Sequence, residues 1–244
     1  MKFFSYFILS FFLIFPANSD QIYELIKIPN LKLYKIENNG LKYLNPSKPF
    51  VAGVGINNVS CSSTKKQNIN ENYDQVIKNF NIYKRDFLQK INLKYIVLCK
   101  NLKVSEISAL GFANPEMKTL IFNINTEKKL FDRILHHEVF HFIQYNNEEL
   151  FNQESWKKLN ISNFNYQDCS TCSNNIELKY SNNNKGFLTD YSMSNPYEDM
   201  AEIYSFMKTN KKLLLKRLQD DQIIENKVNF LKNNISKINQ NFEF

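Results

Sequence analysis

The sequence predicts an α+β fold, in which a small mixed sheet packs on helices and a helical subdomain ends the chain. Three observations predict it. Apolar residues recur at helical spacing from Tyr73 to Ile91, short apolar runs separated by turn residues follow between positions 93 and 124, and helical patterns return from Asn195 onward. Elements in this order can form one sheet covered by helices. The 244 residues suffice for one substantial core.

Residues 1–19 have the pattern of a secretory signal peptide. Lys2 precedes the apolar run from Phe3 to Phe15, and Ala17-Asn18-Ser19 supplies the small residues of a cleavage site after Ser19. The apolar run is short for a membrane span, and no later segment could cross a bilayer. We therefore expect a secreted or periplasmic protein without a transmembrane span in its mature form, with an uncleaved N-terminal anchor as the alternative.

Residues 20–72 are expected to form an N-terminal arm with short strands. Ile22 to Ile28 and Leu31 to Ile36 are typical of strands, and Asn38-Asn39-Gly40 is typical of a turn. Asn, Ser, Thr and Lys dominate residues 57–72, which we interpret as an exposed connection. The main domain then spans residues 73–244.

The main domain begins with the helix from Tyr73 to Ile91, followed by a β-branched strand from Leu93 to Leu98. Two strands are expected at Ala109 to Ala113 and Thr119 to Ile124, joined by a turn at Asn114-Pro115. The Asn-rich region from residue 146 to 190 contains the only tryptophan, Trp156. Because long loops in compact domains are often functional, we expect this region to form one wall of a cleft.

A second long helix is expected from about Glu127 to Tyr145, and it contains the motif H-E-x-x-H. His137 and His141 lie one turn apart on one side of such a helix, so both imidazoles can bind a single Zn²⁺ beside Glu138. A random chain of this composition would contain the motif roughly twice in a thousand cases. These three polar residues also fall within the apolar arc of the helix, where burial would require partners. A metal ion is the simplest partner.

The opposite side of this helix is expected to be polar. It contains Lys129, Asp132, Arg133, His136 and Gln144. We interpret His136 as a residue at the polar edge or as a support for a metal ligand.

A zinc site also needs a third protein ligand, with water in the fourth position. No histidine follows His141, so the third ligand is expected to be a carboxylate, and Glu198 is the best candidate. Its alternative role is that of a helix cap, because Asn195-Pro196 with a glutamate three residues after the asparagine is a typical helix start.

Several of these residues match a known pattern. Tyr191 precedes Glu198 by seven residues and Glu202 follows it by one helical turn, and the stretch from Trp156 to Asn160, with Phe164 and Tyr166, adds to the match. From Leu130 to Met207 the sequence resembles the gluzincin metallopeptidases, which include the catalytic domain of anthrax lethal factor and a group of secreted bacterial zinc-binding metallopeptidases. The resemblance implies a zincin-like fold.

The resemblance also implies roles for individual residues. His137, His141 and Glu198 would bind one Zn²⁺, Glu138 would act as general base, and Glu202 would orient a ligand histidine. Tyr191 would donate a proton to the oxyanion, with plain packing as the alternative. The segment from Ser108 to Asn114 would bind an extended peptide by β-augmentation. Asp199 is expected to be a solvent-facing residue or a helix-start charge.

Four cysteines in an exported chain suggest two disulfides with three possible connectivities. The preferred pairing joins Cys61 to Cys99 and Cys169 to Cys172. A redox or second metal role is the alternative for the C-x-x-C motif at Cys169.

The formal net charge is +7, and basic residues concentrate only near the C-terminus. We interpret this group as a solvated helix face and expect no nucleic-acid partner; it contains Lys208, Lys211, Lys212, Lys216 and Arg217.

The sequence thus predicts an exported zinc-dependent endopeptidase that acts on a peptide or protein substrate. The alternative is a catalytically silent, zinc-containing binding or adhesion module of the cell envelope. The intact Glu138 argues against the alternative, because a purely structural zinc site needs no general base.

Overall fold

The computed structural model describes residues 30–54, 57–167, 178–181 and 183–244. The expected signal peptide, the strand expected at Ile22 to Ile28 and the Cys169–Cys172 pairing lie outside the described residues.

The sheet is mixed and is built around one long strand, β5 (Tyr95–Val104). The first half of β5 lies parallel to β2 (Lys42–Pro46) and β8 (Thr119–Asn123), and its second half pairs antiparallel with β4 (Asn57–Ser62) and β6 (Ile107–Ser108). Three outer strands pair antiparallel with these: β1 (Leu31–Ile36) with β2, β3 (Phe50–Val54) with β4, and β7 (Gly111–Asn114) with β8. Within the described chain β7 pairs with β8 alone, so it is an edge strand.

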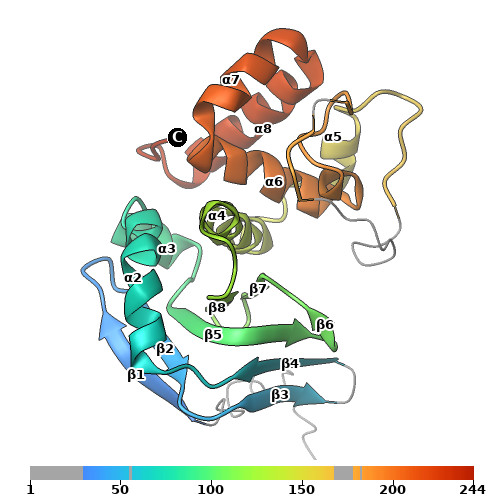
Figure 1. Cartoon of the computed structure of the whole chain (residues 1–244). Coiled ribbons are helices and arrows are strands. Elements are labelled where there is room, and N and C mark those ends of the chain that lie inside the picture. Colours follow the sequence, from blue (N-terminus) through green and yellow to red (C-terminus); the bar gives the residue numbers. More distant parts are fainter. Residues whose placement is uncertain (1–29, 55–56, 168–177, 182) are drawn as a thin grey trace, which may run out of the picture.

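The helices form two further layers (Figure 1). Helix α4 (Lys128–Tyr145) lies between the sheet and the C-terminal helices α6 (Pro196–Thr209), α7 (Lys211–Asp220) and α8 (Gln222–Ile238). Helices α2 (Lys66–Phe80) and α3 (Arg85–Lys90) lie beside α4, and the short α5 (Gln153–Lys157) and the 3-10 turn η1 (Tyr191–Met193) precede α6. This mixed arrangement of a sheet and helices agrees with the predicted α+β class.

Two predictions for the first part of the chain are wrong. Residues 57–72 are not an exposed connection, because they form β4 and the beginning of α2. The polar composition hid the buried Ile69, which continues the apolar face of α2 formed by Tyr73, Val76 and Phe80. The helix expected from Tyr73 to Ile91 is two helices, α2 and α3. They are separated by a turn that buries Tyr83.

The strand β5 separates two apolar clusters because its side chains alternate between the two faces of the sheet. Ile96 and Leu98 point into the main core beneath α4, whereas Val97 and Cys99 belong to a smaller cluster on the other face. Cys99 forms a disulfide with Cys61 of β4, which confirms that predicted pairing. The bond closes a sequence separation of 38 residues, which contributes about 4 kcal/mol in the chain-entropy account.

Among the residues described, no helix has the length and apolar character needed to cross a membrane.

Candidate metal centre

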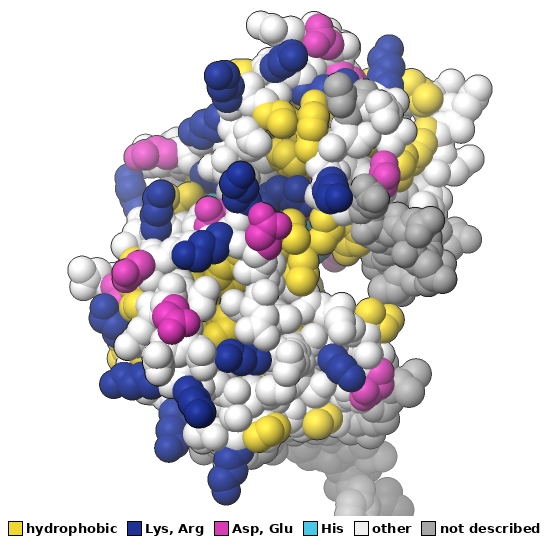
Figure 2. All heavy atoms as spheres, in the orientation of Figure 1, with side chains coloured by type: hydrophobic (Ala, Val, Ile, Leu, Met, Phe, Trp, Pro, Cys, Tyr) yellow, Lys and Arg dark blue, Asp and Glu magenta, His cyan; other side chains and the backbone are white. Residues whose placement is uncertain are grey.

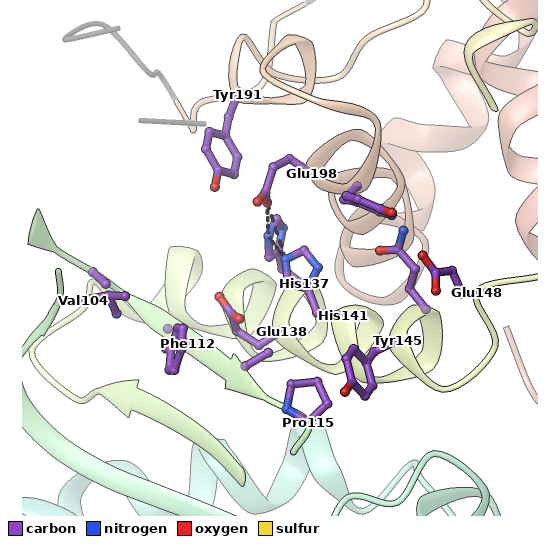
Figure 3. Close-up of a pocket in the computed structure, with 15 residues that line it drawn as sticks. Val104, Phe112, Pro115, His137, Glu138, His141, Tyr145, Glu148, Tyr191 and Glu198 are labelled. Atoms are coloured by element: carbon purple, nitrogen blue, oxygen red, sulfur yellow. Dashed lines mark hydrogen bonds and ion pairs between the residues drawn. The ribbon is translucent and has the colours of Figure 1, made fainter. Parts of the chain in front are cut away.

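Helices α4 and α6 together position the three predicted metal ligands. Helix α4 carries His137 and His141 on the side that faces the first turn of α6 (Figure 3). Asn195 caps the start of helix α6. Its side chain accepts hydrogen bonds from the backbone N–H groups of Tyr197 (2.9 Å) and Glu198 (3.0 Å). Pro196 then occupies the first helical position. Asn195 therefore makes the cap contacts, and the carboxylate of Glu198 extends toward the histidines.

The donor atoms of His137, His141 and Glu198 converge on one point. The Nε2 atom of His137 lies 2.9 Å from Oε2 of Glu198 and 3.1 Å from Nε2 of His141, and the third distance, from His141 to Glu198, is 3.5 Å. A tetrahedral zinc ion with bonds of about 2.0–2.1 Å separates its ligand atoms by about 3.3 Å. The three distances bracket this value, so the residues fit a zinc ion with one open position.

Glu202 contacts the other ring nitrogen of His137. Its Oε1 atom lies 3.0 Å from Nδ1 of His137, and its Oε2 atom accepts hydrogen bonds from Thr189 (2.8 Å) and Arg133 (3.1 Å). Burial raises the pKa of Glu202, but the contacts with His137 and Arg133 outweigh this effect and hold that pKa below its usual value. An ionised carboxylate only accepts hydrogen bonds, so Nδ1 carries a hydrogen, and Nε2 is the ring nitrogen that faces the cluster.

The charge around His137 is strongly negative. Burial lowers the pKa of His137, but the carboxylates of Glu198 and Glu202 outweigh burial and raise this pKa to about 10. Such a pair of carboxylates stabilises positive charge at this point, whether it is a proton or a metal ion. A bound metal must displace the proton on Nε2, so its binding releases a proton.

Glu138 lies beside the donor atoms at the wall of a cavity of about 600 Å³ (Figure 3). Burial raises its pKa, and the nearby imidazoles of His141 and His137 oppose this rise. The backbone of Ala113 in β7 also hydrogen-bonds to the Glu138 carboxylate. The edge strand β7 and the metal cluster thus hold this carboxylate between them.

Tyr191 lies on η1, above the cluster in Figure 3. Its ring centroid is 5.9 Å from that of His137, and the residue lines the same cavity. Burial, followed by the negative charges of Glu198 and Glu138, raises its pKa well above the usual value. The phenol therefore remains protonated and can donate a hydrogen bond into the cavity.

Of the two roles expected for Asp199, the solvent-facing one is wrong, whereas its place in the first turn of α6 agrees with the helix-start role. Asp199 is fully buried, and its Oδ2 atom accepts hydrogen bonds from Trp156 (2.8 Å), Tyr166 (2.6 Å) and Lys227 (2.6 Å). The helix α8 supplies Lys227, which no local pattern around Asp199 could reveal. The group anchors the first turn of α6, next to Glu198.

The expected polar side of α4 is also partly wrong, because Arg133, His136 and Gln144 are buried. His136 does not contact the predicted ligands: its Nδ1 and Nε2 atoms lie 2.6 Å from the Tyr83 hydroxyl and 3.0 Å from Oδ1 of Asn79. Burial, with the nearby charge of Lys208, lowers the pKa of His136 to about 3. This histidine is therefore a neutral, hydrogen-bonded core residue near neutral pH.

Sequence reasoning missed Thr189 and Gly111, and it placed Arg133 on the wrong side. A Cβ atom at Gly111 would lie 2.7 Å from Cγ of Glu138, so only glycine allows this close approach of β7 to α4. One sequence feature could have indicated the place of Arg133 near the site: it lies one turn before His137, on the same face of the helix.

The described residues of the Asn-rich region contribute to the cleft at two points. Glu148 lines the cavity and Leu178 lines an adjoining hollow, but Trp156 is buried away from it.

The basic group near the C-terminus is only partly a solvated helix face. Lys211, Lys212 and Lys216 are exposed, but Lys208 lies 4.1 Å from the ring centroid of Phe242, and Arg217 pairs with Asp221. Figure 2 shows Lys and Arg side chains spread over the visible face, from the helical half to the sheet.

A family model described as "Putative zinc-binding metallo-peptidase" matches residues 63–244, about three quarters of the chain. No match was found among curated proteins. The matched range contains the whole cluster of His137, His141 and Glu198. In the described part of the chain, this is the only group of three or more His, Cys, Asp or Glu side chains that could hold a metal ion. The chain belongs to this family of zinc-binding metallopeptidases.

Proposed function

We propose that this protein is an exported, zinc-dependent endopeptidase of the gluzincin type, with one Zn²⁺ bound by His137, His141 and Glu198. The observation that carries the proposal is the convergence of these three donors beside a buried carboxylate in an open cavity. When bound, the ion supplies Lewis-acid chemistry toward a carbonyl oxygen and lowers the pKa of water. The signal-peptide pattern and the Cys61–Cys99 disulfide support export, because disulfides persist in oxidising compartments.

Glu138 is the proposed general base. It takes a proton from the attacking water and delivers it to the leaving amine. Its position beside the donor atoms supports this role, and so does its raised pKa, which makes the carboxylate a stronger base. Tyr191 donates its hydroxyl hydrogen to the oxyanion that forms at the scissile carbonyl, and Glu202 holds the ring of His137 in orientation.

The proposed substrate is an extended peptide bound along β7. This strand pairs with β8 on one edge, and Gly111, Phe112 and Ala113 line the cavity. The free edge of such a strand can hydrogen-bond to a peptide backbone by β-augmentation. The cavity is mainly apolar along this edge, where Val104, Ala109 and Phe112 accompany Pro115 and Tyr145.

The test of the function is cleavage of a broad peptide library by the purified protein, with and without a strong chelator. Cleavage that stops with the chelator and returns with added zinc supports the proposal. A zinc-loaded protein that cleaves no peptide would instead favour a zinc-containing binding module.

Peptidase activity should fall in acid because Glu138 must be ionised to accept a proton. Burial raises the pKa of Glu138 in the metal-free protein, and the charge of a bound zinc ion would oppose this rise, so kcat/KM should decrease as Glu138 becomes protonated in acid. The measurement is a pH–rate profile, with zinc content determined at every pH to separate loss of the metal from protonation of the base. A pH–rate profile that does not fall in acid while zinc is retained contradicts this assignment.

Replacing Gly111 with alanine should reduce activity without removing the metal. The new Cβ would meet Oε1 of Glu138 at 2.8 Å and Ile134 at 2.9 Å, so the base must move. A displacement of the Glu138 carboxylate by about 1 Å lowers kcat/KM by on the order of 10²-fold. Kinetics and zinc content would check this.

Gly186→Ala provides a control that is disturbed at least as strongly, because its Cβ would meet Ile223 at 2.8 Å, away from the cavity, and its backbone φ of 86° strains an alanine. Both substitutions overpack the protein, which should lower stability by about 1–3 kcal/mol, and backbone strain adds to this loss at Gly186. Equal losses of kcat/KM in the two variants would show that overpacking alone explains the effect.

A further inference from the structure

The side chain of Thr189 lies between two parts of the candidate site. Its hydroxyl donates to Oε2 of Glu202 at 2.8 Å and accepts a hydrogen bond from the backbone N–H of Ser192 at 3.1 Å. The Ser192 hydroxyl oxygen lies 3.1 Å from the Thr189 hydroxyl oxygen and is its third partner. A threonine hydroxyl has one donor and two acceptor positions, and here all three are used. Thr189, Ser192 and Glu202 are fully buried, so water does not compete for these contacts.

The two partners of Thr189 lead to different functional groups. Glu202 contacts Nδ1 of His137 through its other oxygen, at 3.0 Å. Ser192 follows Tyr191 in the η1 turn, so the hydrogen bond from its N–H fixes the backbone that carries the phenol. One hydroxyl therefore joins the support of a metal ligand to the support of the proposed oxyanion donor.

We propose that Thr189 is a positioning residue that couples the orientation of His137, through Glu202, to the placement of Tyr191. This inference rests on the proposed function for the role of Tyr191, but the coupling itself does not depend on catalysis. A metal on His137 restrains its ring, which restrains Glu202 and then the turn from Asp190 to Ser194. Because coupling between sites is reciprocal, a secured turn also favours metal binding.

Thr189→Val removes the hydroxyl while keeping the shape of the side chain. The protein should still fold, because Arg133 remains on Oε2 of Glu202 and the Ser192 N–H still reaches the backbone oxygen of Thr189 at 3.2 Å. Thr189→Ser keeps the hydroxyl and should behave like the wild type. Thr119→Val is the matched control, since Thr119 is also buried and donates its hydroxyl hydrogen to a backbone oxygen, that of Met117, outside the cluster.

The deciding experiment is hydrogen exchange, measured by mass spectrometry on the peptide that covers residues 189–194, with and without zinc. In the wild type and Thr189→Ser, zinc should slow exchange roughly fivefold or more. In Thr189→Val this slowing should disappear, and zinc affinity should fall about tenfold, as for other residues that support a ligand. Thr119→Val should retain both properties. An unchanged zinc response in Thr189→Val would overturn the proposal.

Kinetics provide a second measurement that a purely structural role would not reproduce. Tyr191→Phe should lower kcat by on the order of 10²-fold. Thr189→Val should lower kcat about tenfold with little change in KM, but less than about threefold in the Tyr191→Phe background, because its effect passes through Tyr191. If the losses of kcat in the two single variants multiply fully in the double variant, the coupling is contradicted. A zinc-responsive turn in a protein that cleaves no peptide would refute the peptidase function and leave the coupling established.

Discussion

Glu138→Gln should abolish most peptidase activity while leaving the zinc site intact. The amide has nearly the shape of the carboxylate and can still accept a hydrogen bond from the backbone of Ala113, but it cannot accept a proton from water. General acid–base catalysis contributes about 10²–10⁴-fold, so kcat/KM should fall by this range. The measurement combines steady-state kinetics with zinc content by mass spectrometry, and one zinc per chain should remain.

Glu149→Gln is the matched control for this substitution. Glu149 is an exposed glutamate beyond the end of α4 and lies outside the cavity lining, so its replacement removes one negative charge without touching the cluster. Its kcat/KM should equal that of the wild type. Activity retained by Glu138→Gln would refute the role of Glu138 as base. Loss of zinc together with activity would show that Glu138 acts on the metal site instead.

Glu198→Ala should remove the third ligand, and with it most of the zinc affinity. The Glu198 carboxylate lies 2.9 Å from Nε2 of His137 and 3.5 Å from that of His141, so its loss leaves two protein ligands. Residues that only support a ligand cost about 10–100-fold in affinity, and a ligand should cost more than ~100-fold. Zinc titration against a competing chelator would measure the affinity. Glu202→Gln should lose only about 10–100-fold in zinc affinity, because Glu202 supports a ligand.

The same variant distinguishes a metal ligand from a helix cap. Loss of a cap costs typically about 1 kcal/mol of stability, with or without metal. Asn195 makes the cap hydrogen bonds, so Asn195→Ala should lose stability without zinc but still bind the ion. Glu198→Ala should lose zinc affinity, together with the contact that Glu198 makes with His137 in the metal-free protein. A Glu198→Ala variant that binds zinc normally but loses about 1 kcal/mol would identify Glu198 as a cap residue.

Local sequence patterns predicted the elements that carry the site. The helix expected from about Glu127 to Tyr145 is α4, the strands around Asn114-Pro115 are β7 and β8, and the helix start at Asn195 is confirmed. Each of these elements is marked by a regular spacing of apolar residues or by a capping residue within a few positions of its start. The prediction failed at α2, where polar residues surround a single buried isoleucine, Ile69, in the first turns.

Burial of polar side chains was predicted least well. One of the two roles expected for Asp199 was solvent-facing, and Arg133 and His136 were placed on a polar face, because a helical wheel assigns charged residues to the outside. Each is buried against a partner that lies far away in the sequence: Lys227 for Asp199, Glu202 for Arg133 and Tyr83 for His136. The free energy of burying a charged or polar group depends on that partner, which a local pattern does not contain.

The sequence by itself determined that His137, Glu138 and His141 share one face of a helix, because helical geometry sets the direction of side chains four residues apart. It also supplied the preferred pairing of Cys61 with Cys99, one of three possible connectivities, which the disulfide in the structure bears out. Only the tertiary structure decided that Glu198 reaches both histidines and that Thr189 joins Glu202 to the turn of Tyr191. These contacts depend on the packing of α6 against α4, which is set by apolar surfaces distributed over the whole chain.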